Sequence, residues 1–155
     1  MTWTIHALPL TLFRAMFDLT DVELDALGAR RMTADAPHAA PCRVSLKDAT
    51  PGERLILVNH VHLDAPGSPY RQGGPVFVRE AAREAAPTAE VPDMLARRLL
   101  SVRAFDADAL MIGAEVLDGR DLANWLDRAF ADEAASRVQI HTARRGCFLA
   151  EARPD

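Results

Sequence analysis

Four short segments combine the apolar residues typical of a β-strand with a basic side chain, and this combination limits the fold more than any other feature of the chain. The segments cover residues 42–46, 76–80, 100–105 and 140–147. Successive side chains point to opposite faces of a strand, so each basic residue either faces water or lies in a polar pocket with partners. The pattern predicts a half-buried sheet whose basic side chains, if gathered on one face, would form a site for an anion.

The composition is that of a folded protein with one core. Of the 155 residues, 49% are hydrophobic and 26% charged, and a chain of this length buries about two thirds of its unfolded surface in one domain. We therefore expect a single domain over residues 1–155. Its net charge of −4 provides no basic field to attract nucleic acid. No apolar run reaches membrane-spanning length and no export signal opens the chain, so we expect no membrane partner and a cytoplasmic location.

The order of the predicted elements favours an α+β fold. Residues 99–105 and 111–117 are expected to pair as a β-hairpin, and a helix is expected to begin at Asp118. The apolar residues of this helix, which must cover a sheet, repeat at helical spacing: Leu122, Trp125, Leu126 and Phe130. Hairpins with helices at intervals predict one α+β domain, in which an antiparallel or mixed sheet carries its helices mainly on one face.

Two further predictions concern the middle of the chain. Residues 43–46 and 55–61 are expected to form a hairpin around a turn that contains Pro51 and Gly52. Residues 63–75 include three prolines and three glycines and are expected to form a long loop. Because long ordered loops often carry function, this loop is a candidate lid in which Tyr70 and Arg71 close over a ligand.

Several blocks of sequence occur together over nearly the whole chain. They are residues 41–46, 68–71, 77–80, 99–106 and 143–147, together with Asn59 and His62. In this combination the chain resembles a bacterial family of about the same length that is catalogued as a domain of unknown function. The resemblance implies that the Arg, His and Cys blocks belong to one recurring pattern, and it implies no activity. It also implies an aromatic residue at the position of His60, so a His60/His62 metal pair would not be a family property.

The strand-borne arginines are the first candidate site. Arg79 shares a strand face with Phe77, and Arg103 shares one with Phe105. Such arginines lie on a solvated face, form ion pairs with neighbouring carboxylates, or line a cavity that binds a carboxylate or phosphate through forked hydrogen bonds. The side chains expected at this anion site are Arg79, Arg103, Arg145, His62 and His141, with Arg43 as a further candidate and Tyr70 and Arg71 on the covering loop.

Cys147 and His141 are the candidates for catalysis. Cys147 follows Gly146 and two arginines, and nearby positive charge favours the reactive thiolate. His141 is the nearest base in the sequence, six positions away across a bend. The alternatives are an inert, packed Cys147 and a structural His141. Cys42 and Cys147 are expected to be free thiols, and the lack of closely spaced ligand pairs predicts no metal or other cofactor.

Three classes of function remain open. The first is a protein that binds a small anionic metabolite, with or without catalysing a reaction on it. The second is a thiol-dependent enzyme or redox sensor that uses Cys147. The third is a non-catalytic interaction module, which an exposed apolar patch or a dimer face would distinguish. The sequence does not set the oligomeric state.

Overall fold

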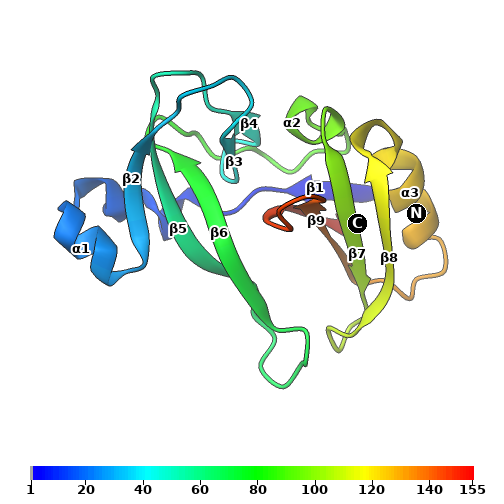
Figure 1. Cartoon of the computed structure of the whole chain (residues 1–155). Helices are drawn as coiled ribbons and strands as arrows, with labels where there is room; N and C mark the ends of the chain where they lie inside the picture. Colours follow the sequence, from blue (N-terminus) through cyan, green and yellow to red (C-terminus); the bar gives the residue numbers. More distant parts are fainter. Residues whose placement is uncertain (1) are drawn as a thin grey trace.

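A computed structural model describes residues 2–155 of the chain as two five-stranded sheets with few helices (Figure 1). In spatial order, sheet A contains β1 (Trp3–His6), β10 (Phe148–Pro154), β9 (Arg137–Thr142), β7 (Leu99–Phe105) and β8 (Met111–Asp118). In the same way, sheet B contains β2 (Ala29–Thr33), β5 (Arg54–Leu63), β6 (Gln72–Arg79), β3 (Pro41–Cys42) and β4 (Lys47–Asp48).

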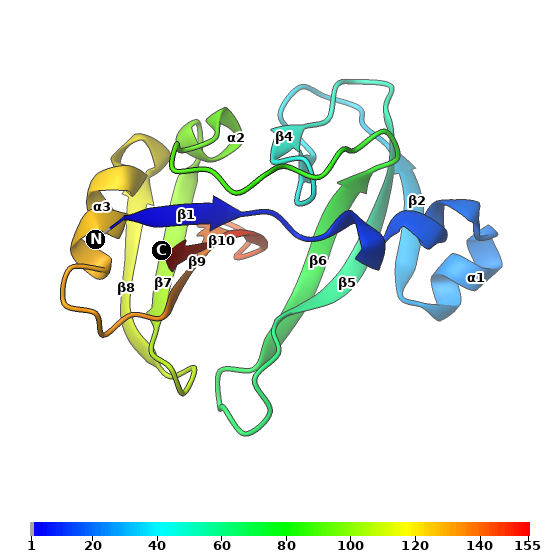
Figure 2. The same ribbon diagram turned by 180° about the vertical axis from the view of Figure 1, so that it is seen from behind.

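The helices are short. The α-helices are α1 (Asp21–Ala26), α2 (Asp93–Ala96) and α3 (Leu122–Ala129), and the 3-10 helices are η1 (Leu10–Leu12), η2 (Arg14–Asp18) and η3 (Gly119–Asp121). Figures 1 and 2 show α1 beside sheet B and α3 beside sheet A, at opposite ends of the molecule. Strands make up 39% of the chain and helices 19%, so the prediction of an α+β fold holds only in outline. One sheet with its helices on one face is replaced by two sheets, each with its own helices.

Sheet A follows the local sequence pattern. β7 and β8 pair as the predicted hairpin, with Leu100 opposite Leu117. The α3 helix covers this sheet through Leu122, Leu126 and Phe130, which are all completely buried. Trp125, the fourth apolar residue of the predicted stripe, is only half-buried at the edge of the same core. The helix therefore packs as expected, except that its tryptophan covers the rim of the core.

Sheet B departs from the sequence predictions at two places. Residues 43–46 form a turn between β3 and β4 and not a strand, and β5 pairs with β2 and β6. The prediction was wrong because residues 41–46 are all buried, the polar Arg43 and Ser45 included, so their alternation of apolar and polar residues does not reflect the two faces of a strand. The predicted loop over residues 63–75 is also shorter than expected, since β5 extends to Leu63 and β6 begins at Gln72.

The two sheets stand side by side, and the chain crosses between them several times. The segment after β1 runs along the back of both sheets (Figure 2), and the loop between β9 and β10 projects into the space between them (Figure 1). Backbone hydrogen bonds from Leu8 N to Arg43 O (2.9 Å) and from Ala85 N to Val44 O (2.9 Å) hold the turn after β3 in place. Within residues 2–155, none of the helices has the length and apolar character needed to cross a membrane.

Candidate functional site

The face of sheet A opposite α3 is buried but polar. Gln139 and His141 on β9 are completely buried and Glu151 on β10 nearly so. The strand register places Arg103 of β7 opposite Gln139, and Gln139 opposite Glu151. Since residues opposite each other in a sheet project to the same face, these side chains form one polar layer.

His62 of sheet B completes this polar layer, which we define as His62, Gln139, His141 and Glu151. The Gln139 amide nitrogen donates to the His62 carbonyl (2.7 Å) and to Glu151 Oε2 (3.1 Å). The Gln139 Oε1 atom therefore accepts from His62 Nδ1 (2.8 Å), which fixes the proton of His62 on Nδ1. Glu151 Oε1 also accepts from Arg153 Nε (2.8 Å). The polar layer thus joins the two sheets through the hydrogen bonds between Gln139 and His62.

His141 is the member of the layer whose partners are incomplete. Its Nδ1 donates to the Gly146 carbonyl (3.1 Å), while its Nε2 is buried and has no partner among the described residues. Burial, assisted by the nearby charge of Arg103, lowers the pKa of His141 to about 3. The imidazole is therefore neutral at physiological pH and a weak base. The hydrogen bond from His141 Nδ1 to the Gly146 carbonyl holds the loop between β9 and β10.

Arg103 lies beside His141, as the sequence analysis anticipated for these two residues. Its Nε donates to Ser101 Oγ (3.3 Å) and its Nη1 to Gln72 Oε1 (3.3 Å). A Cβ atom placed on Gly146 would lie 3.9 Å from Arg103 Nη2, so the guanidinium approaches the same loop that His141 holds. No carboxylate of the described chain forms an ion pair with Arg103.

Arg79 lies elsewhere, in an ion pair with a residue that the sequence analysis did not consider. Its Nη2 and Nε donate to Glu53 Oε1 at 2.7 and 2.9 Å, and its Nη1 donates to Ser45 Oγ at 3.2 Å. Hydrogen bonding from Arg79 lowers the pKa of Glu53, which keeps that carboxylate charged. The charge of Arg79 is therefore satisfied within the protein.

Tyr70 and Arg71 belong to a loop that is tied down at the far end of the sheets. The Tyr70 ring meets Phe105 edge-on at 6.0 Å between centroids, and Arg71 Nε contacts Asp64 Oδ1 at 3.1 Å. Ser68 Oγ also donates to the Ala109 carbonyl (2.8 Å), which links this loop to the turn between β7 and β8. Through their own contacts Tyr70 and Arg71 anchor the loop.

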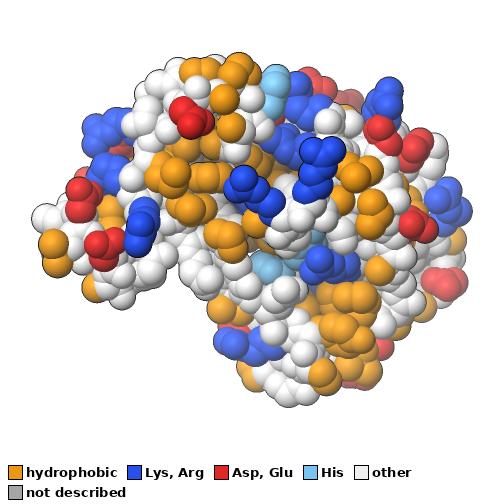
Figure 3. All heavy atoms as spheres, in the orientation of Figure 1, with side chains coloured by type: hydrophobic (Ala, Val, Ile, Leu, Met, Phe, Trp, Pro, Cys, Tyr) orange, Lys and Arg blue, Asp and Glu red, His pale blue; other side chains and the backbone are white. Residues whose placement is uncertain are grey.

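A cavity of about 520 Å³ opens between the two sheets beside the loop of residues 143–147. The loop contributes Arg145 and Cys147, and the turn after β3 contributes Arg43. Figure 3 shows Lys and Arg side chains gathered on this face, over the region between the sheets. The other lining residues are Asp35, His38, Ala39, Pro41, Leu57, Pro75, Phe77, Arg98 and Thr142. Of the predicted site residues this cavity includes Arg145 and Cys147, and it does not include Arg79, Arg103, His62 or His141.

Arg43 is the most unusual residue of the cavity. It is 2% exposed, its Nε donates to the Phe148 carbonyl (2.6 Å), and its Nη1 donates to the Pro41 carbonyl. Burial lowers the pKa of Arg43 to about 10, which still leaves the guanidinium protonated at neutral pH. Within residues 2–155 no carboxylate pairs with it, and its Nη2 has no hydrogen-bond partner. Arg43 thus brings a buried, uncompensated positive charge to the cavity wall.

The other arginines of the cavity differ in whether their charge is compensated. Arg98 donates to both carboxylate oxygens of Asp48, at 2.6 and 3.2 Å. Arg145 is exposed and has no ion pair among the described residues. Asp35, which is exposed, is the single carboxylate that lines the cavity. Arg43 and Arg145 are therefore the two cations available to a ligand.

The sequence analysis named Arg145 and Cys147 but gave Arg43 only as one of several further candidates. Its sequence run resembles those of Arg79 and Arg103, so nothing local distinguishes it. What sets Arg43 apart is that its Nε reaches the Phe148 carbonyl, 105 positions away in sequence. Tertiary folding creates this contact, and no sequence motif predicts it.

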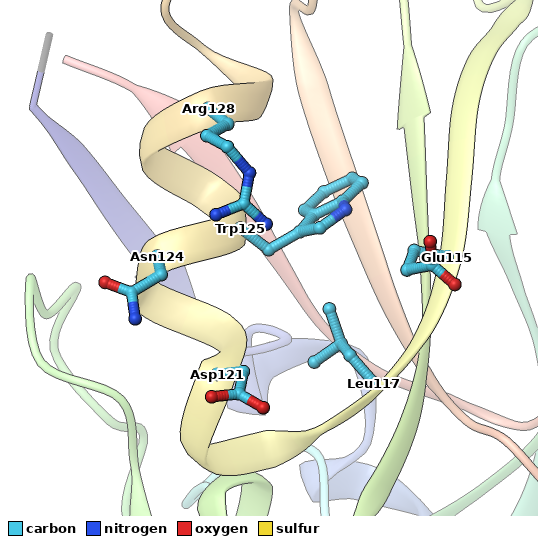
Figure 4. Close-up of a pocket in the computed structure, with 6 residues that line it drawn as sticks. All are labelled: Glu115, Leu117, Asp121, Asn124, Trp125 and Arg128. Atoms are coloured by element: carbon cyan, nitrogen blue, oxygen red, sulfur yellow. The ribbon is translucent and has the colours of Figure 1, made fainter.

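A second hollow of about 460 Å³ lies between α3 and β8 on the outer side of sheet A (Figure 4). Trp125 lies between the helix and the strand, near Leu117, with the charged residues Glu115, Asp121 and Arg128 around it. These groups have both signs and are open to water. Among residues 2–155, moreover, no three His, Cys, Asp or Glu side chains are close enough together to hold a metal ion.

A protein family described as "Protein of unknown function (DUF1203)" matches residues 39–153. The chain belongs to this family. The resemblance to a domain of unknown function is therefore confirmed, and the DUF1203 span includes Arg43, Arg145 and Cys147. All the residues that line the cavity, except Asp35 and His38, lie within this span. No curated protein and no solved structure matches the chain.

Proposed function

We propose that the protein binds a small anionic metabolite, a carboxylate or a phosphate, in the cavity between its two sheets. The observation that carries this proposal is the state of Arg43, a protonated guanidinium that is 2% exposed and has no carboxylate partner among the described residues. Removing an ion from water costs several kcal/mol unless charge and hydrogen bonds compensate it. An anion in the cavity would supply both.

The cavity also has the composition expected of a site for a small polar ligand. Arg43 at its wall and Arg145 at its mouth would donate from two directions, and Leu57 and Phe77 would supply an apolar surface. Guanidinium groups suit carboxylates and phosphates because their planar fork donates two parallel hydrogen bonds. The volume of about 520 Å³ accommodates a metabolite and not a polymer.

A thermal-shift screen with inorganic phosphate, sulfate and small carboxylates tests this proposal. Ligands that bind the folded state raise Tm in proportion to the logarithm of their concentration above Kd. We expect Arg145→Ala to weaken binding about tenfold, the effect of losing one charge-assisted hydrogen bond. Arg144→Ala is the matched control, because Arg144 is equally exposed and does not line the cavity.

Arg43→Lys tests the buried position, since it keeps the charge and removes the fork. It should fold and should bind the anion more weakly than the wild type. If no anion raises Tm, or if Arg145→Ala and Arg144→Ala respond alike, the proposal is wrong. We further propose that this binding takes place in the cytoplasm, without nucleic acid or a membrane as partner.

A second candidate function, an interaction module, is favoured by the outer edge of sheet A. β8 is the last strand of its sheet, and its Ile112 and Val116 are 48% and 56% exposed. Exposed apolar residues on a strand whose outer edge is unpaired favour pairing with another chain. Light scattering of the wild type and of Ile112→Lys tests this candidate: a dimer that the substitution disrupts would support it, and a monomer in both would exclude self-association.

A further inference from the structure

Building on the proposed anion site, we infer that Cys147 is a nucleophile for small anions that carry an electrophilic carbon. Cys147 is partly exposed, and its side chain lines the same cavity as Arg43 and Arg145. An anion held by these arginines would therefore lie in the space that the thiol faces.

The loop of residues 143–147 places the sulfur firmly. Thr142 N donates to the Cys147 carbonyl (2.9 Å), and Cys147 N donates to Thr142 Oγ1 (3.1 Å). His141 holds the preceding Gly146 carbonyl through Nδ1 (3.1 Å). The Cys147 Sγ–H group points toward the Arg145 carbonyl at 3.9 Å, a weak contact that leaves the sulfur free to react. His141 acts here as a positioning residue, because it holds the loop and does not touch the ligand.

The arginine charges connect the thiol to the anion site. Arg43 has a free Nη2, is nearly completely buried and lines the cavity, so it provides evidence for a ligand that is independent of the cysteine. Of the neighbouring charges that oppose the lowered pKa of Arg43, a thiolate at Cys147 contributes most. The thiol therefore faces the same space toward which the charges of Arg43 and Arg145 attract an anion.

The reaction is a substitution at carbon. The Cys147 Sγ forms a bond to the electrophilic carbon, and the bond between that carbon and its leaving group breaks. The leaving group departs with the bonding electron pair, and the thiol proton passes to solvent. The product is a thioether, and no oxidant or reductant takes part.

Iodoacetate and iodoacetamide are matched probes of this inference, because they transfer similar groups and only the first is an anion. Peptide mass spectrometry gives the rate of labelling at Cys147 with each reagent, in the folded protein and in urea. We expect the ratio of the iodoacetate rate to the iodoacetamide rate to be about tenfold higher in the folded protein. Inorganic phosphate should slow the iodoacetate reaction. Cys42, which is completely buried, is an internal control and should stay unlabelled while the protein is folded.

Variants separate this inference from the anion site on which it depends. Arg145→Ala should return the labelling ratio toward its unfolded value, and Arg144→Ala should leave it unchanged. Cys147→Ser should keep the rise in Tm with phosphate. If the wild type shows that rise but its labelling ratio matches the unfolded chain, the inference is overturned and the anion site stands. If phosphate neither raises Tm nor slows labelling, both are wrong.

Discussion

The two faces of sheet A bury different kinds of side chain at their centres. On one face Ile140 packs against Leu126 and Phe130 of α3, and on the other Gln139 and His141 meet His62 of sheet B; apart from the half-buried His62, all of these residues are completely buried. The apolar face stabilises the fold through the area that it removes from water. The polar face is stable only as far as its hydrogen bonds are satisfied. Burial alone therefore does not distinguish a core from a site.

A missing hydrogen-bond or ion-pair partner says more about a buried polar group than its burial does. Gln139 has all the partners that it needs, and Arg79 has Glu53. His141 Nε2 and Arg137 Nε have none within residues 2–155, and no carboxylate of that part of the chain forms an ion pair with the buried Arg43. His141 and Arg43 both lie next to the loop of residues 143–147, whereas Arg137 lies at the other end of β9.

The largest effect is expected on the apolar face. Phe130→Ala should destabilise the protein by about 3–5 kcal/mol, since it removes a fully buried ring and leaves a cavity. Urea unfolding measures this loss. The variant should keep the increase in Tm with phosphate, because Phe130 is on the side of the sheet away from the cavity. A loss below about 1 kcal/mol would contradict the assignment of Phe130 to the core.

The polar face should respond to acid. Because the pKa of His141 is about 3 in the folded state and 6.5 as its ordinary value, the unfolded chain binds a proton that the folded chain does not. This contribution to stability is complete above pH 6.5 and is lost as the pH falls, by about 2–3 kcal/mol between pH 6 and pH 4. The free energy of unfolding of His141→Asn should depend on pH less steeply than that of the wild type, by the equivalent of one bound proton. Equal slopes in the two proteins would refute this assignment.

The hydrogen bonds of the polar layer should be the next in size. Gln139→Leu should cost about 2 kcal/mol, because it removes the hydrogen-bond partner of Glu151 Oε2 and that of His62 Nδ1 in a buried place. The double variant Gln139→Leu with Glu151→Leu should recover part of that loss. Additive losses in the double variant, measured by urea unfolding, would show that the two side chains do not depend on each other.

The smallest effect is expected at the rim of the apolar face. Trp125 is half-buried, so Trp125→Ala should cost about 1 kcal/mol, below the range for core aromatics. The difference between the free energies of unfolding of Trp125→Ala and Phe130→Ala measures the contrast between the rim and the centre of the apolar face. A loss as large as that of Phe130→Ala would mean that Trp125 belongs to the core.

The sequence predicted sheet A better than sheet B because sheet A is built from local pairs. β7 joins β8, and β9 joins β10, each across a short connection, and the α3 helix shows its apolar spacing directly. At α1 the capping box likewise joins residues only three positions apart, Thr20 and Glu23. In sheet B, by contrast, the turn after β3 depends on Leu46 in the left-handed region (φ 50°), a conformation that residue type does not suggest.

Strand periodicity can place basic side chains on one face of a sheet, but it does not say which of them line the cavity. Arg103 and His141 lie together because neighbouring strands of one sheet carry them, which strand periodicity can suggest. Arg79 faces Glu53, 26 positions earlier, and no spacing rule marks that ion pair. The partners of each arginine follow from tertiary contacts, and only these contacts separate a satisfied charge from an available one.

The pairing of β1 with β10, in which Trp3 is opposite Pro154, also bears on the order of folding. Strand β1 lies at the edge of sheet A, and within that sheet β10 is its sole neighbour. During synthesis at ordinary translation rates, roughly 10–30 s pass between the appearance of the two strands. For that time Trp3 and Ile5, both buried in the finished protein, await their partner strand. Of the strands of sheet A, the first in the chain can therefore pair within the sheet only after the last has been made.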